Sequence, residues 1–416
     1  MKKPPRNSQP TLKHLAFFEV LAGCAEDSAA ALSATAGLLS LRLIDHWILA
    51  GAPIVQPESL SVRSVRNAIM AMPPHEPLRD LLLGIVNTMQ TLREVDMQPV
   101  LPRLAAYASL LEQRSRFDLA ADVYETVIRL GEEKFDGDVV VDAYLRLGFC
   151  YRTLSAFDAA ERAFVEGGRI AKRRKEVARE LRSRIGLANV TTFRGNLPRA
   201  EELFVEISAD CVRTEQQAEL ASALHGRAFV AMRRGAVCNA TCLAYEALQI
   251  TQSPTERERI LADLSAMLIL EERYEAAYDA LMIIDVTAIS DSIRLGAKVN
   301  LTALAARKGD RELFDRARAD VPTRDLIPEL EVNFLIESAR GLRTFGVVRE
   351  SDVLLLKARE VATAHNLSRS IFEIEEMMTS AVAVSAKRNS GRPEEAETST
   401  VHVERGLREL ALALAS

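Results

Sequence analysis

The sequence contains little cysteine, few aromatic residues and no long uncharged apolar run. Its five cysteines are an odd number without a Cys-x-x-Cys pair, and no histidine follows Cys238 and Cys242 at zinc-binding spacing. We therefore expect reduced cysteines in a helical core and a cytoplasmic location. No stretch reaches ~18 uncharged apolar residues, which argues against a transmembrane helix and a membrane partner. Aromatic residues make up only 5% of the chain, so helices would pack mainly through alanine and leucine.

Motifs for catalysis and cofactor binding are also missing. The six histidines lie away from other histidines and cysteines at metal-ligand spacing, and no Gly-x-Ser-x-Gly, phosphate-binding glycine loop or His-Glu-x-x-His motif occurs. The net charge of −5 is small for 416 residues and argues against a broad nucleic-acid surface. We expect a protein that is not an enzyme and uses no cofactor, metal or nucleic acid.

An internal repeat is what the sequence does contain. Alanines recur every 40 residues at Ala120, Ala160, Ala200 and Ala240, each in a segment with the apolar spacing of a helix. A fifth unit follows 37 residues later at Ala277, and weaker units follow around residues 301–314 and 334–365. The clearest unit reads Tyr144-Leu145-Arg146-Leu147-Gly148-Phe149-Cys150-Tyr151, followed by Phe157, Ala160 and Phe164.

This spacing of large and small residues resembles the tetratricopeptide repeat. The resemblance covers residues 97–366 and implies an all-α protein, an α-α superhelix (solenoid) of about six to seven helix pairs. Two departures are Arg184 at a large first-helix position and the absence of the proline that often closes a unit. Because 40 residues exceed the usual ~34, we expect longer helices or wider connections, near residues 131–138 and 170–177.

The segments outside the repeats predict caps and tails. Residues 1–10 are expected to be disordered, and residues 11–96, punctuated by prolines, to form a helical N-terminal cap. Residues 367–386 predict a C-terminal capping helix, because an open array must cover its last apolar face. Residues 387–400 predict a disordered linker, and 401–416 a short terminal helix or tail.

Two alternatives concern the N-terminal region. Residues 31–47 faintly resemble a helix-turn-helix with Gly37 as the turn, as in a transcriptional or signalling regulator, but only Arg42 could reach phosphates. A Leu-Ala-Gly-Cys sequence ending at Cys24 resembles a lipoprotein export signal, but the apolar stretch before it is short and carries Glu19. An amphipathic helix explains the same residues. A plain helical cap on a cytoplasmic protein is therefore the main interpretation.

Tetratricopeptide proteins usually bind extended peptides in the concave groove that their first helices line. Counting from the alanine anchors places an aromatic and basic set there, which would suit a peptide with an apolar anchor and acidic side chains or a free carboxylate. The expected groove residues are Phe149, Arg152, Arg182, Asn189, Phe193, His225, Phe229 and Arg233. Asn189 matches the family's carboxylate clamp, whereas Ile185 replaces the lysine that would accompany it. Packing between helices is the competing explanation for the aromatic side chains.

A dense basic cluster is the last feature of the sequence. It comprises Lys172, Arg173, Arg174 and Lys175. Cations at the end of a helix complement its dipole, which is the plainer explanation. The alternative is a docking patch for an acidic partner. Together these patterns predict an adaptor or scaffold that binds a protein or peptide partner.

Overall fold

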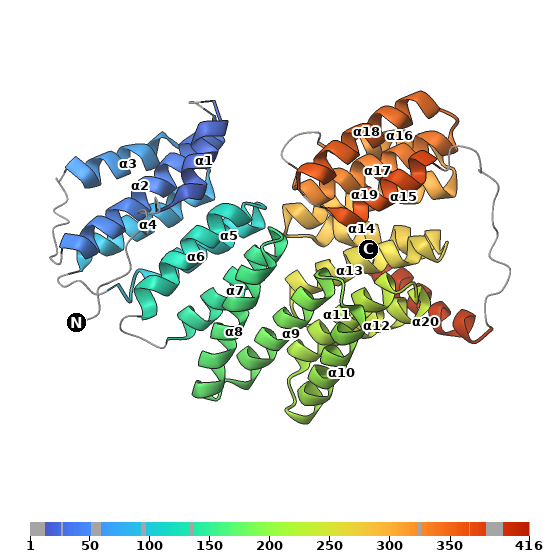
Figure 1. The fold of residues 1–416 in the computed structure, drawn as a ribbon, viewed down its shortest axis with the longest axis horizontal. Coiled ribbons are helices and arrows are strands. Elements are labelled where there is room, and N and C mark those ends of the chain that lie inside the picture. The colour runs from blue at the N-terminus through green and yellow to red at the C-terminus, as the bar shows by residue number, and fades with distance from the viewer. Residues whose placement is uncertain are drawn as a thin grey trace, which may run out of the picture. The chain divides into compact units, whose positions relative to one another are not determined.

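The computed structural model describes residues 13–25, 28–50, 60–92, 97–132, 137–322, 326–365, 367–379 and 394–415. Every regular element in this part of the chain is an α-helix (Figure 1). The helices are α1 (Leu15–Gly23), α2 (Ala29–Ala50), α3 (Leu60–Ala71), α4 (Pro77–Thr91), α5 (Leu101–Gln113), α6 (Phe117–Glu132), α7 (Asp138–Thr153), α8 (Phe157–Arg174), α9 (Val177–Phe193), α10 (Leu197–Arg213), α11 (Gln217–Arg233), α12 (Val237–Ile250), α13 (Pro254–Leu270), α14 (Tyr274–Thr287), α15 (Asp291–Lys308), α16 (Arg311–Ala319), α17 (Pro328–Thr344), α18 (Val348–Ala364), α19 (Ser368–Thr379) and α20 (Glu394–Ala415). The all-α prediction is confirmed.

The chain divides into two compact units, Met1–Val190 (unit 1) and Thr191–Ser416 (unit 2), with the boundary inside α9. From α5 to α18 the helices follow one another as seven pairs, which confirms the predicted number of six to seven. The odd-numbered helix of each pair comes first and the even-numbered helix second. We call them first helices and second helices below.

One backbone conformation marks the turn inside every pair. A residue with positive φ lies between the first and second helix, and its neighbour donates its N–H to the carbonyl five residues earlier, as Ala156 does to Tyr151 at 2.8 Å. The positive-φ residues are Ser115, Ser155, Gly195, Gly235, Glu272, Gly309 and Gly346. Their separations are 40, 40, 40, 37, 37 and 37 residues. The two periods found in the sequence are therefore present in the backbone.

Helix length accounts for the change of period. The second helices α8 and α10 have 18 and 17 residues, whereas α12 and α14 have 14 each. Residues 170–174 continue α8, so the surplus predicted there extends a helix. Residues 133–136, within the other predicted surplus, lie outside the described residues. The extra residues of the 40-residue repeat therefore lengthen its second helix by about one turn.

Small residues let neighbouring helices approach. The anchors Ala120, Ala160, Ala200 and Ala240 are fully buried. Large residues of a second helix press on glycine in the next first helix; a Cβ atom on Gly226, for example, would overlap the ring of Phe204. Such packing is close to crystal density and tolerates little change in volume. The predicted alternation of small anchors and large fillers is thus the packing scheme of the repeats.

The structure of the N-terminal region contradicts the helix-turn-helix alternative. Helix α2 runs unbroken from Ala29 to Ala50 and passes through Gly37 without a turn. Gly37 is buried, and a Cβ atom there would overlap Tyr107 and Phe17. The glycine therefore serves the close approach of packed side chains, and the helix-turn-helix prediction is wrong.

Helix α1 is part of the packed structure of unit 1. It lies against α2 and α6, and its Phe17 is fully buried. His14, just before the helix, lies 2.5 Å from Asp122 and 3.4 Å from Asp45. Cleavage before Cys24 would remove these contacts, so the packing favours the amphipathic-helix interpretation over an export signal.

The C-terminal segments differ from their predicted bounds. Helix α19 covers α18 and ends at Thr379, within the predicted capping segment 367–386. Helix α20 begins at Glu394, so the end of the predicted disordered linker 387–400 is helical. Within this stretch Thr400 is buried and accepts a hydrogen bond from Arg273. Residues 1–12 and 380–393 lie outside the described residues.

Candidate functional site

Charged pairs join consecutive first helices about one repeat apart in sequence. In unit 1, Arg146 pairs with Glu112, and Arg179 contacts Asp142 at 2.8 and 2.9 Å. In unit 2 the same arrangement joins α15 to α17 and α17 to α19. Its pairs are Arg307 with Glu337 at 2.8 Å and Arg340 with Glu373 at 2.8 Å. Cations of the first helices are thus commonly neutralised by the neighbouring repeat, and sequence analysis did not identify these acidic partners.

His225, another of the expected groove residues, also has its carboxylate partners on the neighbouring repeat. Its Nε2 lies 2.8 Å from Asp263 and its Nδ1 lies 3.4 Å from Glu256, both on α13. Burial alone would lower the pKa of His225, but the two carboxylates raise it to about 9. The imidazolium is therefore already paired inside the protein, and its chief role is to join α11 to α13.

Phe149 and Arg152 form an aromatic-basic cluster in unit 1. The Phe149 ring meets Phe117 edge to face at 5.9 Å, and the guanidinium carbons of Arg146 and Arg152 each lie 5.1 Å from its centroid. This ring therefore packs between helices and between two cations. Packing, the competing explanation for the aromatic side chains, applies to Phe149.

Arg182 and Asn189 are the other expected groove residues in unit 1. Arg182 is exposed and Asn189 is half-buried, both on α9. Ile185, which stands where a family clamp would have lysine, is buried. An apolar buried residue cannot bind a carboxylate, so the clamp is not reproduced here.

Phe193, Phe229 and Arg233 form the corresponding cluster of unit 2. The two rings stack at 5.6 Å with 25° between their planes, and the Arg233 guanidinium lies 6.0 and 5.8 Å from their centroids. Arg233 also donates a hydrogen bond of 3.3 Å to the carbonyl of Thr192. Among the residues that the structure describes, no carboxylate lies within ion-pairing distance of Arg233. Burial lowers the pKa of this guanidinium and the charge of Arg369 lowers it further, against a smaller opposing effect of the Glu329 carboxylate.

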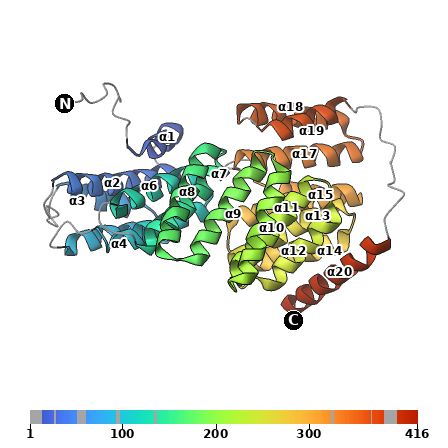
Figure 2. The same ribbon diagram turned by 60° about the horizontal axis from the view of Figure 1, so that its bottom comes forward.

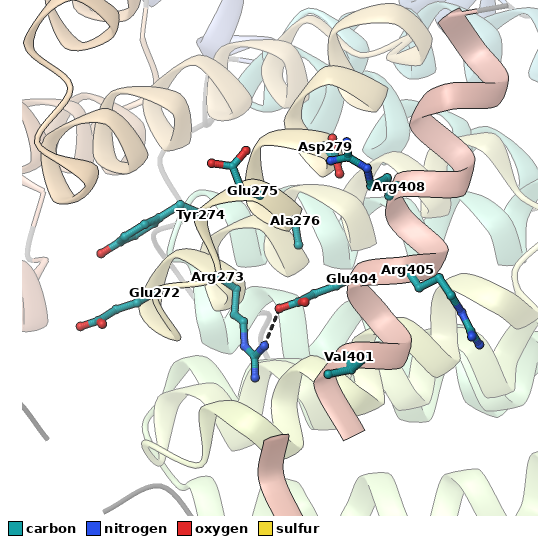
Figure 3. Close-up of a pocket in the computed structure, with 10 residues that line it drawn as sticks. All are labelled: Glu272, Arg273, Tyr274, Glu275, Ala276, Asp279, Val401, Glu404, Arg405 and Arg408. Carbon is teal, nitrogen blue, oxygen red and sulfur yellow. Dashed lines mark hydrogen bonds and ion pairs between the residues drawn. The ribbon is translucent and has the colours of Figure 1, made fainter. Parts of the chain in front are cut away.

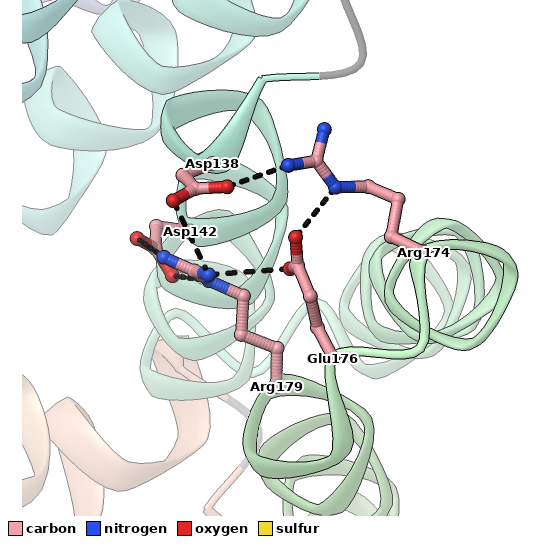
Figure 4. Close-up of polar contacts among 5 residues, drawn as sticks. All are labelled: Asp138, Asp142, Arg174, Glu176 and Arg179. Atoms are coloured by element: carbon pink, nitrogen blue, oxygen red, sulfur yellow. Dashed lines mark hydrogen bonds and ion pairs between the residues drawn. The ribbon is translucent and has the colours of Figure 1, made fainter.

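The basic cluster at the end of α8 is partly neutralised. Arg174 pairs with Asp138 at 2.6 Å and with Glu176 at 2.5 Å, and Arg179 joins the same acids (Figure 4). Hydrogen bonding to Asp142 raises the pKa of Arg179 above its ordinary value. Lys172, Arg173 and Lys175 are exposed at the helix end. Arg174 thus joins the end of α8 to α7 of its own pair and to Glu176 in the turn before α9.

The described residues offer neither a metal-binding group nor a membrane-spanning helix. No group of three or more histidine, cysteine or acidic side chains there could hold a metal ion. Nor is any described helix long and apolar enough to cross a bilayer. The aromatic-basic clusters of the two units are therefore the strongest candidates for a binding site.

Comparisons with known proteins identify a fold and no family. No family model matches the chain, and no curated protein matches its sequence. A Rap protein in complex with competence and sporulation factor is similar in structure, with a TM-score of 0.53 and 12% identity, over 79% of this chain and 98% of that one. A Rap conjugation gene regulator of the plasmid pLS20, in complex with a Phr peptide, has a TM-score of 0.55 and 11% identity, over 84% of this chain and 99% of that one. At such identities the likeness shows a shared helical repeat fold.

Proposed function

We propose that the chain is a divergent tetratricopeptide-like adaptor without catalytic activity that binds an extended peptide segment of a partner on its first helices. One structural neighbour was solved with a Phr peptide and another with competence and sporulation factor, and the peptide complex supports this class of ligand. The chain's own residues supply the argument for where and what it binds.

Arg233 is the observation that carries the proposal. Other first-helix cations, such as Arg179 and Arg307, have carboxylate partners on neighbouring repeats. Arg233 instead lies half-buried over two aromatic rings, and the carboxylate that acts on it, Glu329, forms no ion pair with it. A desolvated cation of this kind gains most from a ligand that brings its own negative charge.

The chemistry of the ligand follows from this cluster. The stacked rings of Phe193 and Phe229 offer an apolar surface, and Arg233 offers paired N–H donors beside it. A peptide with an acidic side chain or a free C-terminal carboxylate next to an apolar residue would satisfy both. Arg182, Asn189 and the unit 1 cluster of Phe149 and Arg152 remain predicted peptide contacts of unit 1 by itself.

Selection from a defined peptide library tests this proposal. The wild-type chain should enrich peptides that combine a carboxylate with an apolar side chain, and Arg233→Gln should weaken the best of them at least tenfold, the equivalent of ~1.4 kcal/mol. Arg227→Gln is the matched control, because Arg227 lies on the same helix and is paired with Glu201 at 3.2 Å. Peptides that bind wild type and Arg233→Gln equally well would place the site elsewhere, and a library that yields no binder would argue against the peptide adaptor.

A further inference from the structure

Helix α20 lies on the opposite side of the repeats from the first helices. It packs against the second helices α12 and α14, which are shorter than α8 and α10 (Figure 2). Its Val403 and Leu407 are buried and belong to the apolar core that α11–α15 build in unit 2. The proposed peptide site on the first helices does not explain why a terminal helix is held here.

The contact is specific in shape. Gly406 faces Tyr245 of α12, and a Cβ atom on Gly406 would overlap the tyrosine hydroxyl. The Tyr245 ring also meets the ring of His402 edge to face, with 5.5 Å between centroids. A small residue is therefore required at this one point of the helix, with apolar side chains three positions before it and one position after it.

The contact is also specific in charge. Arg273, in the turn before α14, lies 2.5 Å from Glu404 and donates a hydrogen bond of 2.7 Å to Thr400 (Figure 3). Arg273 and Glu404 line a cleft between α14 and α20. Farther along the same cleft, Arg408 lies beside Asp279 of α14. An acidic residue two positions before the glycine and a basic residue two positions after it thus meet opposite charges.

From these contacts we propose that the surface of α12 and α14 is a binding site for an amphipathic helix of a partner protein, and that α20 is the intramolecular occupant which that helix displaces. The partner helix would present the pattern of residues 403–408: apolar, acidic, any, small, apolar, basic. Helices that lie in apolar grooves are a common recognition mode, with anchors one helical turn apart.

A partner is a better occupant than a second copy of this chain. A second copy offers the same helix, so exchange would add no contact and would lose the high effective concentration of the tethered helix. In α20 the side chains of Leu412 and Leu414 remain 62% and 45% exposed, beyond the contact with α12 and α14. A partner helix with a longer apolar face in contact with this surface would bind more strongly than α20. A partner helix can therefore compete with α20 only by extending or strengthening the same pattern.

Gly406→Ala in the full chain is the central variant. Alanine favours a helix more than glycine does, so weaker docking could not be ascribed to loss of the helix itself. Gly296→Ala in α15 is the matched control, because no atom lies within 4 Å of a Cβ atom placed there. Hydrogen exchange of residues 400–411 reports whether α20 is released in this variant. If Gly406→Ala does not release α20, Leu407→Glu is used in its place.

A labelled peptide of residues 394–415 then probes the uncovered surface. It should bind the released chain at least tenfold more tightly than it binds wild type or Gly296→Ala. Glu404→Arg in the peptide should abolish binding, and Arg273→Glu in the released chain should restore it. A released chain that binds the peptide no better than wild type, or binding indifferent to this charge exchange, would overturn the proposal. A wild-type dimer that exchanges α20 between differently labelled copies would also overturn it, in favour of a second copy.

Discussion

The two units place arginine beside phenylalanine on their first helices, yet the arginines differ in their partners. In unit 1, Arg146 flanks Phe149 and is paired with the buried Glu112. In unit 2, Arg233 lies over Phe193 and Phe229, and no described carboxylate pairs with it. A paired cation has its charge satisfied within the fold, whereas an unpaired and half-buried one keeps its strongest interaction for a ligand. The same residue types thus form an internal ion pair in unit 1 and, in unit 2, the cluster for which we propose a ligand.

The largest expected difference is in stability. Arg146→Ala would leave Glu112 buried without its cation and should reduce the free energy of unfolding by about 3 kcal/mol, whereas Arg233→Ala should reduce it by less than about 1 kcal/mol. Urea unfolding, with hydrogen exchange resolved for each unit, would measure both losses of unfolding free energy, since the two units need not unfold together. Equal losses in the two variants would contradict the distinction between paired and unpaired cations.

The next effect concerns pH. The pKa of His225 is about 9 in the folded chain, above its ordinary value of 6.5. Its stabilisation of unit 2 is therefore complete below pH ~6.5 and is lost as pH rises through 9, a change of about 3 kcal/mol. His225→Gln should flatten the pH dependence of hydrogen exchange in α11 and α13 over this window. The exposed His46 is the control, and His46→Gln should leave the profile unchanged.

A third comparison uses the rings themselves. Phe229→Ala should weaken a selected peptide about tenfold, or ~1.4 kcal/mol, because it removes half of the stacked surface beside Arg233. Phe149→Ala should instead destabilise unit 1 by about 1 kcal/mol, because Phe149 packs on Phe117. Binding titrations and unfolding curves on both variants would show which of them loses peptide affinity and which loses stability. A reversed result would move the peptide site to unit 1.

The smallest effect is expected at the end of α8. Lys172 and Lys175 are exposed, so Lys172→Ser with Lys175→Ser should change the unfolding free energy by less than about 0.5 kcal/mol. The affinity for a peptide selected on the first helices should also be unchanged. A loss of peptide affinity that disappears at high salt would revive the acidic-partner patch.

Sequence reasoning predicted the repeats well because their signals are local. The spacing of Ala120, Ala160, Ala200 and Ala240 follows from helix geometry and from one turn conformation that recurs with the same period. The role of the expected groove residues in binding stays a prediction, and only their positions can be compared with the structure. Phe193, Phe229 and Arg233 come together, but the neutralisation of His225 depends on residues of the next repeat. Opposite charges one repeat apart are the signal that could have found these pairs.

The sequence by itself determined the all-α class, the seven helix pairs and their two periods, because each needs only the chain's own turns and apolar spacing. The tertiary structure alone decided which cations are paired, why Gly37 lies inside a helix and where α20 lies. These outcomes depend on which side chains meet across space. A buried charge, or a glycine beneath a large ring, has no meaning until its neighbour from another helix is in place.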